Sequence, residues 1–217
     1  MKNVLITIAC ICLLPIAYSS EGTDLWFTVN SSSKNVGDNT KTKTHFEIRL
    51  PDFEEIGYFR VSQKFNTNIG QNWSLGTHPV VEFSKQGDDW NNTYRFDLEL
   101  NPAKFTLGEN GPSISMRNRW ELRWKEGKGS EIFHRVRHSS KATWKIDTGP
   151  FTSFTIGDEI FYEADKGKIT KNRFYPVMLG SKLGAHNINY YLLYDSSRQG
   201  TSDNWNGRYI VGSSLSF

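Results

Sequence analysis

Between Ser115 and Lys125 the sequence alternates strictly between apolar or neutral residues and charged ones. One set of alternate positions holds Met116, Asn118, Trp120, Leu122 and Trp124, and the other holds Arg117, Arg119, Glu121 and Arg123. A period of two fits a β-strand and no helix, because successive strand side chains point to opposite faces. A soluble sheet would bury the apolar face and leave the charges in water. A transmembrane barrel would turn the apolar face to lipid and the charges to a lumen.

The same alternation recurs along the chain in short segments, which clusters of Gly, Asn, Asp and Ser separate, and no helical period stands out. The clearest further examples are residues 94–100 and 132–146. A mean hydropathy of −0.55 is compatible with a barrel, since alternation hides the lipid-facing residues from any average. We therefore predict an all-β chain that forms a single antiparallel up-and-down transmembrane β-barrel of about 10–12 strands.

Residues 1–19 have the charged start and short apolar stretch of a secretory signal peptide, so residues 20–217 are predicted to form the barrel domain. Both cysteines, Cys10 and Cys12, lie in this signal, which leaves none for disulfides, thiolate catalysis or metal ligation. The 26 basic and 23 acidic residues nearly balance, and nothing indicates nucleic acid or a cofactor. We expect the protein in a Gram-negative-type outer membrane, with both chain ends on the periplasmic side.

The chain stops on an alternating segment with an aromatic last residue. Counting back from Phe217, the alternate positions hold Leu215, Ser213, Val211 and Tyr209. This ending resembles the C-terminal strand signal of bacterial outer-membrane barrel proteins, which their assembly machinery recognises. The resemblance implies that outer-membrane lipid and this assembly machinery are the partners of the chain.

The charged faces of the predicted strands would meet inside the barrel and form a lumen network. Its expected members are Arg95, Asp97, Glu99, Arg117, Arg119, Glu121, Arg123, Arg135, Arg137, Glu159 and Arg173, with Glu47 among them. Charges enclosed in a barrel must be paired or hydrated, so a salt-bridge ladder that plugs and stiffens the lumen is the first interpretation. The second is a path or pocket for a small anion, because guanidinium groups suit carboxylate and phosphate. A barrel this narrow can be filled by such side chains, which argues against a wide pore.

His138 and Ser140 suggest a hydrolase, because a His two residues from a Ser projects from the same strand face. The pair looks loosely like the His-x-Ser site of the lipid A deacylase barrels, whose catalytic groups face the outer leaflet. The chain departs from that site at Lys141, where Asn is usual, and at Thr152, where an acid would orient the base. We therefore expect no enzymatic activity and keep a deacylase-like hydrolase as a lesser alternative.

Seven tryptophans and nine tyrosines suit the aromatic girdles at the two interfaces of a membrane barrel. The tryptophans assigned to the girdles are Trp26, Trp73, Trp90, Trp120, Trp124, Trp144 and Trp205. In a secreted β-sandwich the same rings could form a sugar-binding platform, so a carbohydrate-binding protein is the alternative from a different class. A sandwich gives no reason for the terminal Phe217 or for arginines gathered on one face of the strands.

Several short motifs resemble the domain of unknown function 2490 family, bacterial proteins taken to be outer-membrane barrels. They are residues 117–123, the Arg135-Val136-Arg137 group, residues 158–161, 172–175 and 190–194, and the early Leu25-Trp26-Phe27. The resemblance implies a barrel fold and an outer-membrane compartment, and it supplies no activity.

Overall fold

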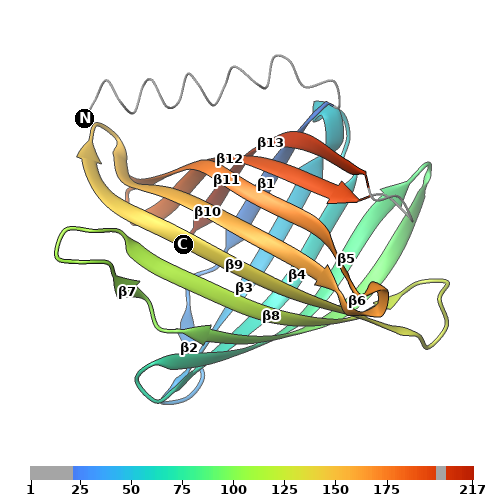
Figure 1. Cartoon of the computed structure of the whole chain (residues 1–217), viewed down its shortest axis with the longest axis horizontal. Helices are drawn as coiled ribbons and strands as arrows, with labels where there is room; N and C mark the ends of the chain where they lie inside the picture. Colours follow the sequence, from blue (N-terminus) through green and yellow to red (C-terminus); the bar gives the residue numbers. More distant parts are fainter. Residues whose placement is uncertain (1–21, 199–203) are drawn as a thin grey trace.

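The computed structural model describes residues 22–198 and 204–217, so the predicted signal peptide at residues 1–19 lies outside the described residues. In this part the wall of a closed barrel is built from eleven strands (Figure 1). They are β1 (Thr23–Asn30), β3 (Thr40–Leu50), β4 (Tyr58–Ile69), β5 (Trp73–Gln86), β6 (Asp89–Pro102), β8 (Ser113–Lys125), β9 (Ile132–Thr148), β10 (Phe151–Glu163), β11 (Lys168–Leu183), β12 (His186–Arg198) and β13 (Trp205–Ser216).

The remaining elements are short and lie at the ends of the wall strands. The two-residue strands β2 (Lys34–Asn35) and β7 (Phe105–Thr106) pair with β3 and β8. Two single 3-10 turns, η2 (Pro51–Phe53) and η3 (Ala164–Lys166), connect β3 to β4 and β10 to β11. Among the described residues no helix has the length and apolar character needed to cross a membrane.

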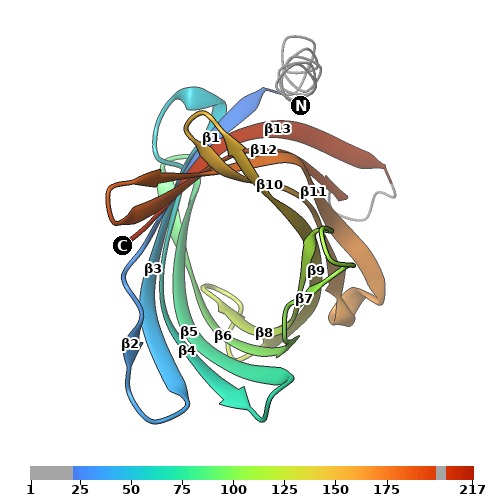
Figure 2. The same cartoon turned by 90° about the vertical axis from the view of Figure 1, so that its left-hand side faces the viewer.

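Consecutive wall strands pair antiparallel, and β1 closes the barrel by pairing with both β3 and β13 (Figure 2). The predicted all-β, up-and-down barrel of 10–12 strands is confirmed, with one parallel pair, β1 with β13. An odd number of strands requires such a pair, because alternating directions cannot close on themselves otherwise. The sandwich alternative is wrong, since the wall strands form one continuous closed sheet.

The parallel pair places the two ends of the described barrel at opposite rims. Thr23 lies opposite Tyr209 at the start of β13, whereas Asn30 lies opposite Ser216 at its end. The N-terminal rim therefore carries Thr23 and the loops 51–57, 87–88, 126–131 and 164–167, and the C-terminal rim carries Phe217 and the loops 31–39, 70–72, 103–112, 149–150 and 184–185. The expectation that both ends lie on one side is wrong for Thr23 and Phe217.

A small apolar core fills the lumen beside the parallel pair. Trp26, Leu193 and Ile210 are 4%, 0% and 0% exposed, and Tyr175 and Tyr191 pack against them. Trp26 therefore does not belong to an outer aromatic girdle, as its sequence context predicted. The face of β1 that carries Asp24, Trp26, Thr28 and Asn30 lines the lumen, and the face that carries Phe27 and Val29 points outward.

Candidate functional site

The strand alternation carries the charged side chains into the lumen, as the sequence predicts. All of the predicted network residues form ion pairs there: Arg95, Asp97, Glu99, Arg117, Arg119, Glu121, Arg123, Arg135, Arg137, Glu159, Arg173 and Glu47. Most are buried, and only Arg117, Arg123 and Arg135 are partly accessible. The first interpretation, a salt-bridge network inside the barrel, is confirmed.

Glu121 is the centre of this network and is 0% exposed. Arg135 donates through Nε to its Oε2 at 2.6 Å, and Arg137 donates to its Oε1 at 2.6 Å. The guanidinium groups of Arg95 and Arg119 each approach Oε1 to 3.7 Å. Four cations from three strands thus surround one carboxylate, which compensates the cost of burying that charge.

Three further carboxylates extend the network across the lumen. Glu159 on β10 accepts from Arg137 at 2.8 Å and from Arg117 on β8. Arg119 donates through Nε to Glu99 at 2.6 Å and lies 3.1 Å from Asp97. The ion pairs of β6, β8, β9 and β10 form one continuous layer, which we call the salt-bridge plug.

Like charges face each other directly within the plug. Asp97 lies opposite Glu121 in the pairing of β6 with β8, and Arg119 lies opposite Arg137 in the pairing of β8 with β9. Direct like-charge pairs are unfavourable in an open sheet. Here each charge also has an opposite charge close by. Arg119 pairs with Glu99 directly opposite it, Glu121 pairs with Arg135 directly opposite it, and Asp97 pairs with Arg95 on its own strand.

The sequence did not reveal several carboxylates of the lumen. Glu82 on β5 accepts a hydrogen bond from the Tyr58 hydroxyl at 2.9 Å and another from Arg95. Glu82 shares the inner face of β5 with Val80 and His78. Because this face mixes apolar and polar residues, the sequence alone did not indicate that it lines a charged lumen. Glu163 and Asp195 likewise pair with lumen arginines. They were not predicted to face the lumen, because they lie toward the ends of their strands.

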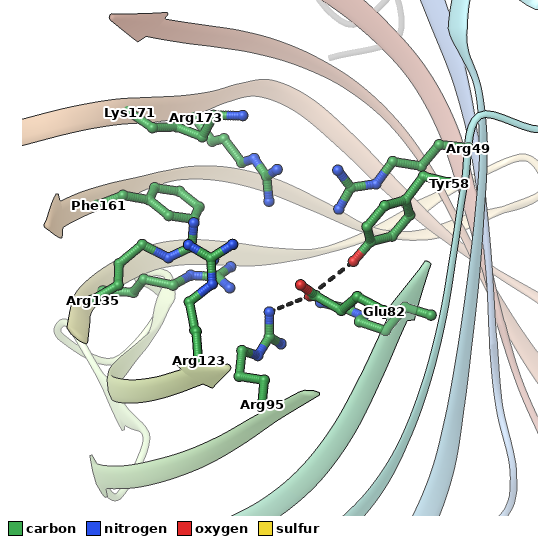
Figure 3. Close-up of a pocket in the computed structure, with 11 residues that line it drawn as sticks. Arg49, Tyr58, Glu82, Arg95, Arg123, Arg135, Phe161, Lys171 and Arg173 are labelled. Carbon is green, nitrogen blue, oxygen red and sulfur yellow. Dashed lines mark hydrogen bonds and ion pairs between the residues drawn. The ribbon is translucent and has the colours of Figure 1, made fainter. Parts of the chain in front are cut away.

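Between the plug and the N-terminal rim lies a cavity of 120 Å³, which we call the cationic chamber (Figure 3). Its cationic lining comprises Arg49, Arg60, Arg95, Arg123, Arg135, Arg137, Lys171 and Arg173, and its other lining residues are Tyr58, Glu82 and Phe161. Glu82 is the one carboxylate among these lining residues. The close-up shows the labelled arginines reaching from opposite sides of the wall into a common space.

Some guanidinium N–H donors in the cationic chamber have no hydrogen-bond acceptor among the described residues. Arg123 comes within 3.7 Å of its carboxylate partner Glu163, and its buried Nε has no hydrogen-bond partner within the described part of the chain. The Nε atom of Arg60 is likewise buried without a hydrogen-bond partner among the described residues, whereas that of Arg173 lies 3.5 Å from Asp195. Since guanidinium groups bind carboxylate and phosphate through paired N–H donors, the chamber has donors suited to an oxyanion.

A second cavity of 360 Å³ lies on the other side of the plug, toward the C-terminal rim. Lys43, Lys64, Arg117 and Lys141 contribute to its lining, together with Arg60, Arg137 and Arg173, which also line the cationic chamber. These shared arginines lie in the layer that separates the two spaces. No group of three or more His, Cys, Asp or Glu that could hold a metal ion occurs within residues 22–198 and 204–217.

A closed β-barrel with arginines and carboxylates paired across its lumen defines the class of this protein. Within that class, the chain belongs to the family described as Protein of unknown function (DUF2490), which it matches over residues 23–207. The resemblance that the short sequence motifs indicated is thereby confirmed. Comparisons with curated proteins and with solved structures gave no match.

Proposed function

We propose that this chain is an outer-membrane barrel whose plugged lumen binds a small anion in the cationic chamber. The observation that carries this proposal is the inverted distribution of side chains, charged inside and apolar outside. Large side chains with 36–57% of their surface exposed cover the outer face: Phe27, Phe46, Ile48, Leu75, Tyr94, Phe96, Leu100, Trp120, Val136, Tyr162, Phe174 and Tyr190. Such a surface is costly in water and favourable in lipid.

Aromatic side chains at the two rims support the membrane part of the proposal. Trp90 and Trp205 lie at the N-terminal rim and are 44% and 42% exposed, and Trp73 lies at the C-terminal rim and is 47% exposed. Trp rings at both edges of an apolar band are typical of barrels that cross a bilayer, where they sit at headgroup level.

The salt-bridge plug favours binding of a small anion in the lumen over its free diffusion through the barrel. Glu121 and Asp97 are 0% and 1% exposed, so water hardly reaches the middle of the lumen. An anion that enters from the N-terminal rim would reach the cationic chamber and stop at the plug. Since ion pairs with carboxylates of the wall already hold most of the lining arginines in place, the anion needs little rearrangement of the network to bind.

Arg123→Gln tests the anion site with little risk to the plug, because Arg123 is the chamber arginine with the most distant carboxylate partner. Inorganic phosphate should raise the unfolding temperature of the purified native barrel above that in sodium chloride of equal ionic strength. A ligand at about 100 times its Kd adds about 2.7 kcal/mol. Arg123→Gln should lose most of this gain, measured as the temperature at which the unboiled gel band shifts to the unfolded position.

Lys128→Gln is the matched control, because Lys128 is an exposed cation in the 126–131 loop at the same rim. It should keep the full stabilisation by phosphate. Equal stabilisation of the Arg123→Gln variant, or no effect of phosphate beyond that of chloride, would contradict an anion site in the chamber.

Removing Phe217 tests the membrane location and the proposed assembly signal of Tyr209, Val211, Leu215 and Phe217. Phe217 is 52% exposed at the C-terminal rim, its N–H donates to the Asn30 carbonyl at 3.1 Å, and its ring contacts His186. In fractionated cells the intact chain should be an outer-membrane protein with a heat-modifiable band. The deletion should reduce that band several-fold, whereas Ser216→Ala should not. Recovery of the intact chain as a soluble protein would contradict the proposal.

A further inference from the structure

A row of polar side chains interrupts the apolar outer face on strands β8 to β11. The row, which we call the polar row, consists of Asn118, His138, Ser140, Asp158 and Asn172. Asn172 donates to Asp158 at 2.9 Å, and Asp158 lies opposite Ser140 in the pairing of β9 with β10. Polar groups on a membrane-facing surface are costly and usually have a function.

The surroundings of the polar row are apolar. Leu100, Trp120 and Val136 lie beside it on the same face and are 49%, 46% and 44% exposed. Ser139, the neighbour of Ser140 in the chain, points instead into the lumen and is 5% exposed. Ser140 and His138 therefore share the outer face, whereas Ser139 has a different environment.

Three side chains of the row form a continuous hydrogen-bond chain. The Nδ2 of Asn118 donates to the Leu100 carbonyl at 3.0 Å, which leaves Oδ1 of Asn118 as an acceptor 2.8 Å from Nδ1 of His138. Nδ1 of His138 must then carry the proton, so Nε2 has the free lone pair. Oγ of Ser140 lies 2.9 Å from Nε2 and donates to it.

This arrangement is that of a nucleophile, a base and an orienting group. A serine hydroxyl becomes a nucleophile when a neighbouring imidazole accepts its proton, and a third group must hold the imidazole in the correct tautomer. An asparagine performs that third role in some hydrolases. The sequence did not indicate Asn118 for this role, because it lies on another strand and meets His138 only through the register of β8 with β9.

We propose that Ser140, His138 and Asn118 form a serine ester-hydrolase site on the outer face, with an acyl ester of a membrane lipid as the substrate. Ser140 is the nucleophile, His138 is the general base and acid, and Asn118 is a positioning residue. The choice of a lipid ester rests on the proposed membrane location, whereas the assignment of the three roles rests on the hydrogen bonds alone.

The reaction follows from these roles. Oγ of Ser140 forms a bond to the ester carbonyl carbon while its proton passes to Nε2 of His138. The ester C–O bond then breaks, the alcohol oxygen takes the proton from His138, and the acyl group stays on Ser140. A water molecule, deprotonated by His138, attacks the acyl-serine, which releases the fatty acid and returns the proton to Ser140.

The polar row also offers a path for water and for the polar end of the lipid. Asn172 lies near the start of β11 at the N-terminal rim, and the Ser196 hydroxyl on β12 donates to its carbonyl at 3.4 Å. From there the row leads through Asp158 to Ser140 deeper in the apolar band. Polar groups on a lipid-facing surface draw in water and thin the bilayer locally, which brings an ester closer to Ser140.

A fluorophosphonate probe tests the site in the full chain, folded in detergent and checked for its heat-modifiable band. The probe should label the wild type and the Ser139→Ala control to the same extent, and it should fail to label Ser140→Ala and His138→Gln. This readout is independent of the membrane location. Absence of labelling of the folded wild type, or equal labelling of folded Ser140→Ala, would overturn the proposal.

Release of fatty acid then identifies the lipid, with phosphatidylethanolamine vesicles and lipopolysaccharide as the two substrates. Ser140→Ala should lower the release at least about 100-fold from whichever substrate is cleaved. Asn118→Ala should lower kcat and leave KM unchanged, and Asn118→Asp, which keeps an acceptor oxygen for His138, should restore part of kcat. Release that persists in Ser140→Ala, or no release from either lipid, would overturn the lipid-hydrolase assignment.

Discussion

Glu121→Gln should lower the free energy of unfolding of the barrel by about 3–5 kcal/mol, the range typical of a buried ion pair that loses one partner. Glu121 is 0% exposed, and Arg95, Arg119, Arg135 and Arg137 all direct guanidinium groups toward it. Glutamine keeps the shape but removes the charge, so four cations, three of them buried, lose their common carboxylate. The effect should appear as a large drop in the temperature at which the unboiled band shifts on a gel.

Two further variants make this result specific to the plug. Glu109→Gln removes an exposed carboxylate from the 103–112 loop and should leave the transition temperature unchanged. Glu121→Gln combined with Arg135→Gln removes both members of one pair and should be less destabilising than the two single changes added together. An unchanged transition in Glu121→Gln would mean that the plug contributes nothing to stability.

The alternation of residues 115–125, together with its repetition along the chain, was enough to predict the barrel and its lumen charges. Strand side chains alternate between two faces without exception in this stretch, so assigning Arg119 and Glu121 to one face also assigns Trp120 and Leu122 to the other. The same argument placed Arg95 and Arg137 inside. The prediction worked where the two faces differ sharply in chemistry.

Where residue type was used in place of strand face, or where a contact depends on register, the sequence was insufficient. Trp26 shares its face of β1 with Asp24 and Thr28, but it was assigned to the outer girdle because it is a tryptophan. The parallel closure of β1 with β13 depends on an odd number of strands, and the sequence left that number between about 10 and 12. Asn118 meets His138 only because β8 and β9 pair in one particular register, which alternation does not specify.

Trp26→Ala should cost about 3–5 kcal/mol of stability, as is typical when a large buried aromatic ring is removed. Trp26 lies on β1, the strand that closes the barrel, and packs with Leu193 and Ile210 in the lumen core. The guanidinium groups of Arg49 and Arg173 lie 3.9 and 4.8 Å from its ring, so the change also removes two cation–π contacts.

Trp90→Ala is the matched control, because Trp90 is an outward-facing ring at the N-terminal rim and is 44% exposed. In detergent it should change the transition temperature little, whereas Trp26→Ala should lower it strongly. The loss in Trp26→Ala should be accompanied by faster hydrogen exchange of the β1 and β13 amides than of the β5 and β6 amides, since the parallel pair loses its inner packing first. Equal exchange in both regions would contradict the view that Trp26 holds the closing strand in place.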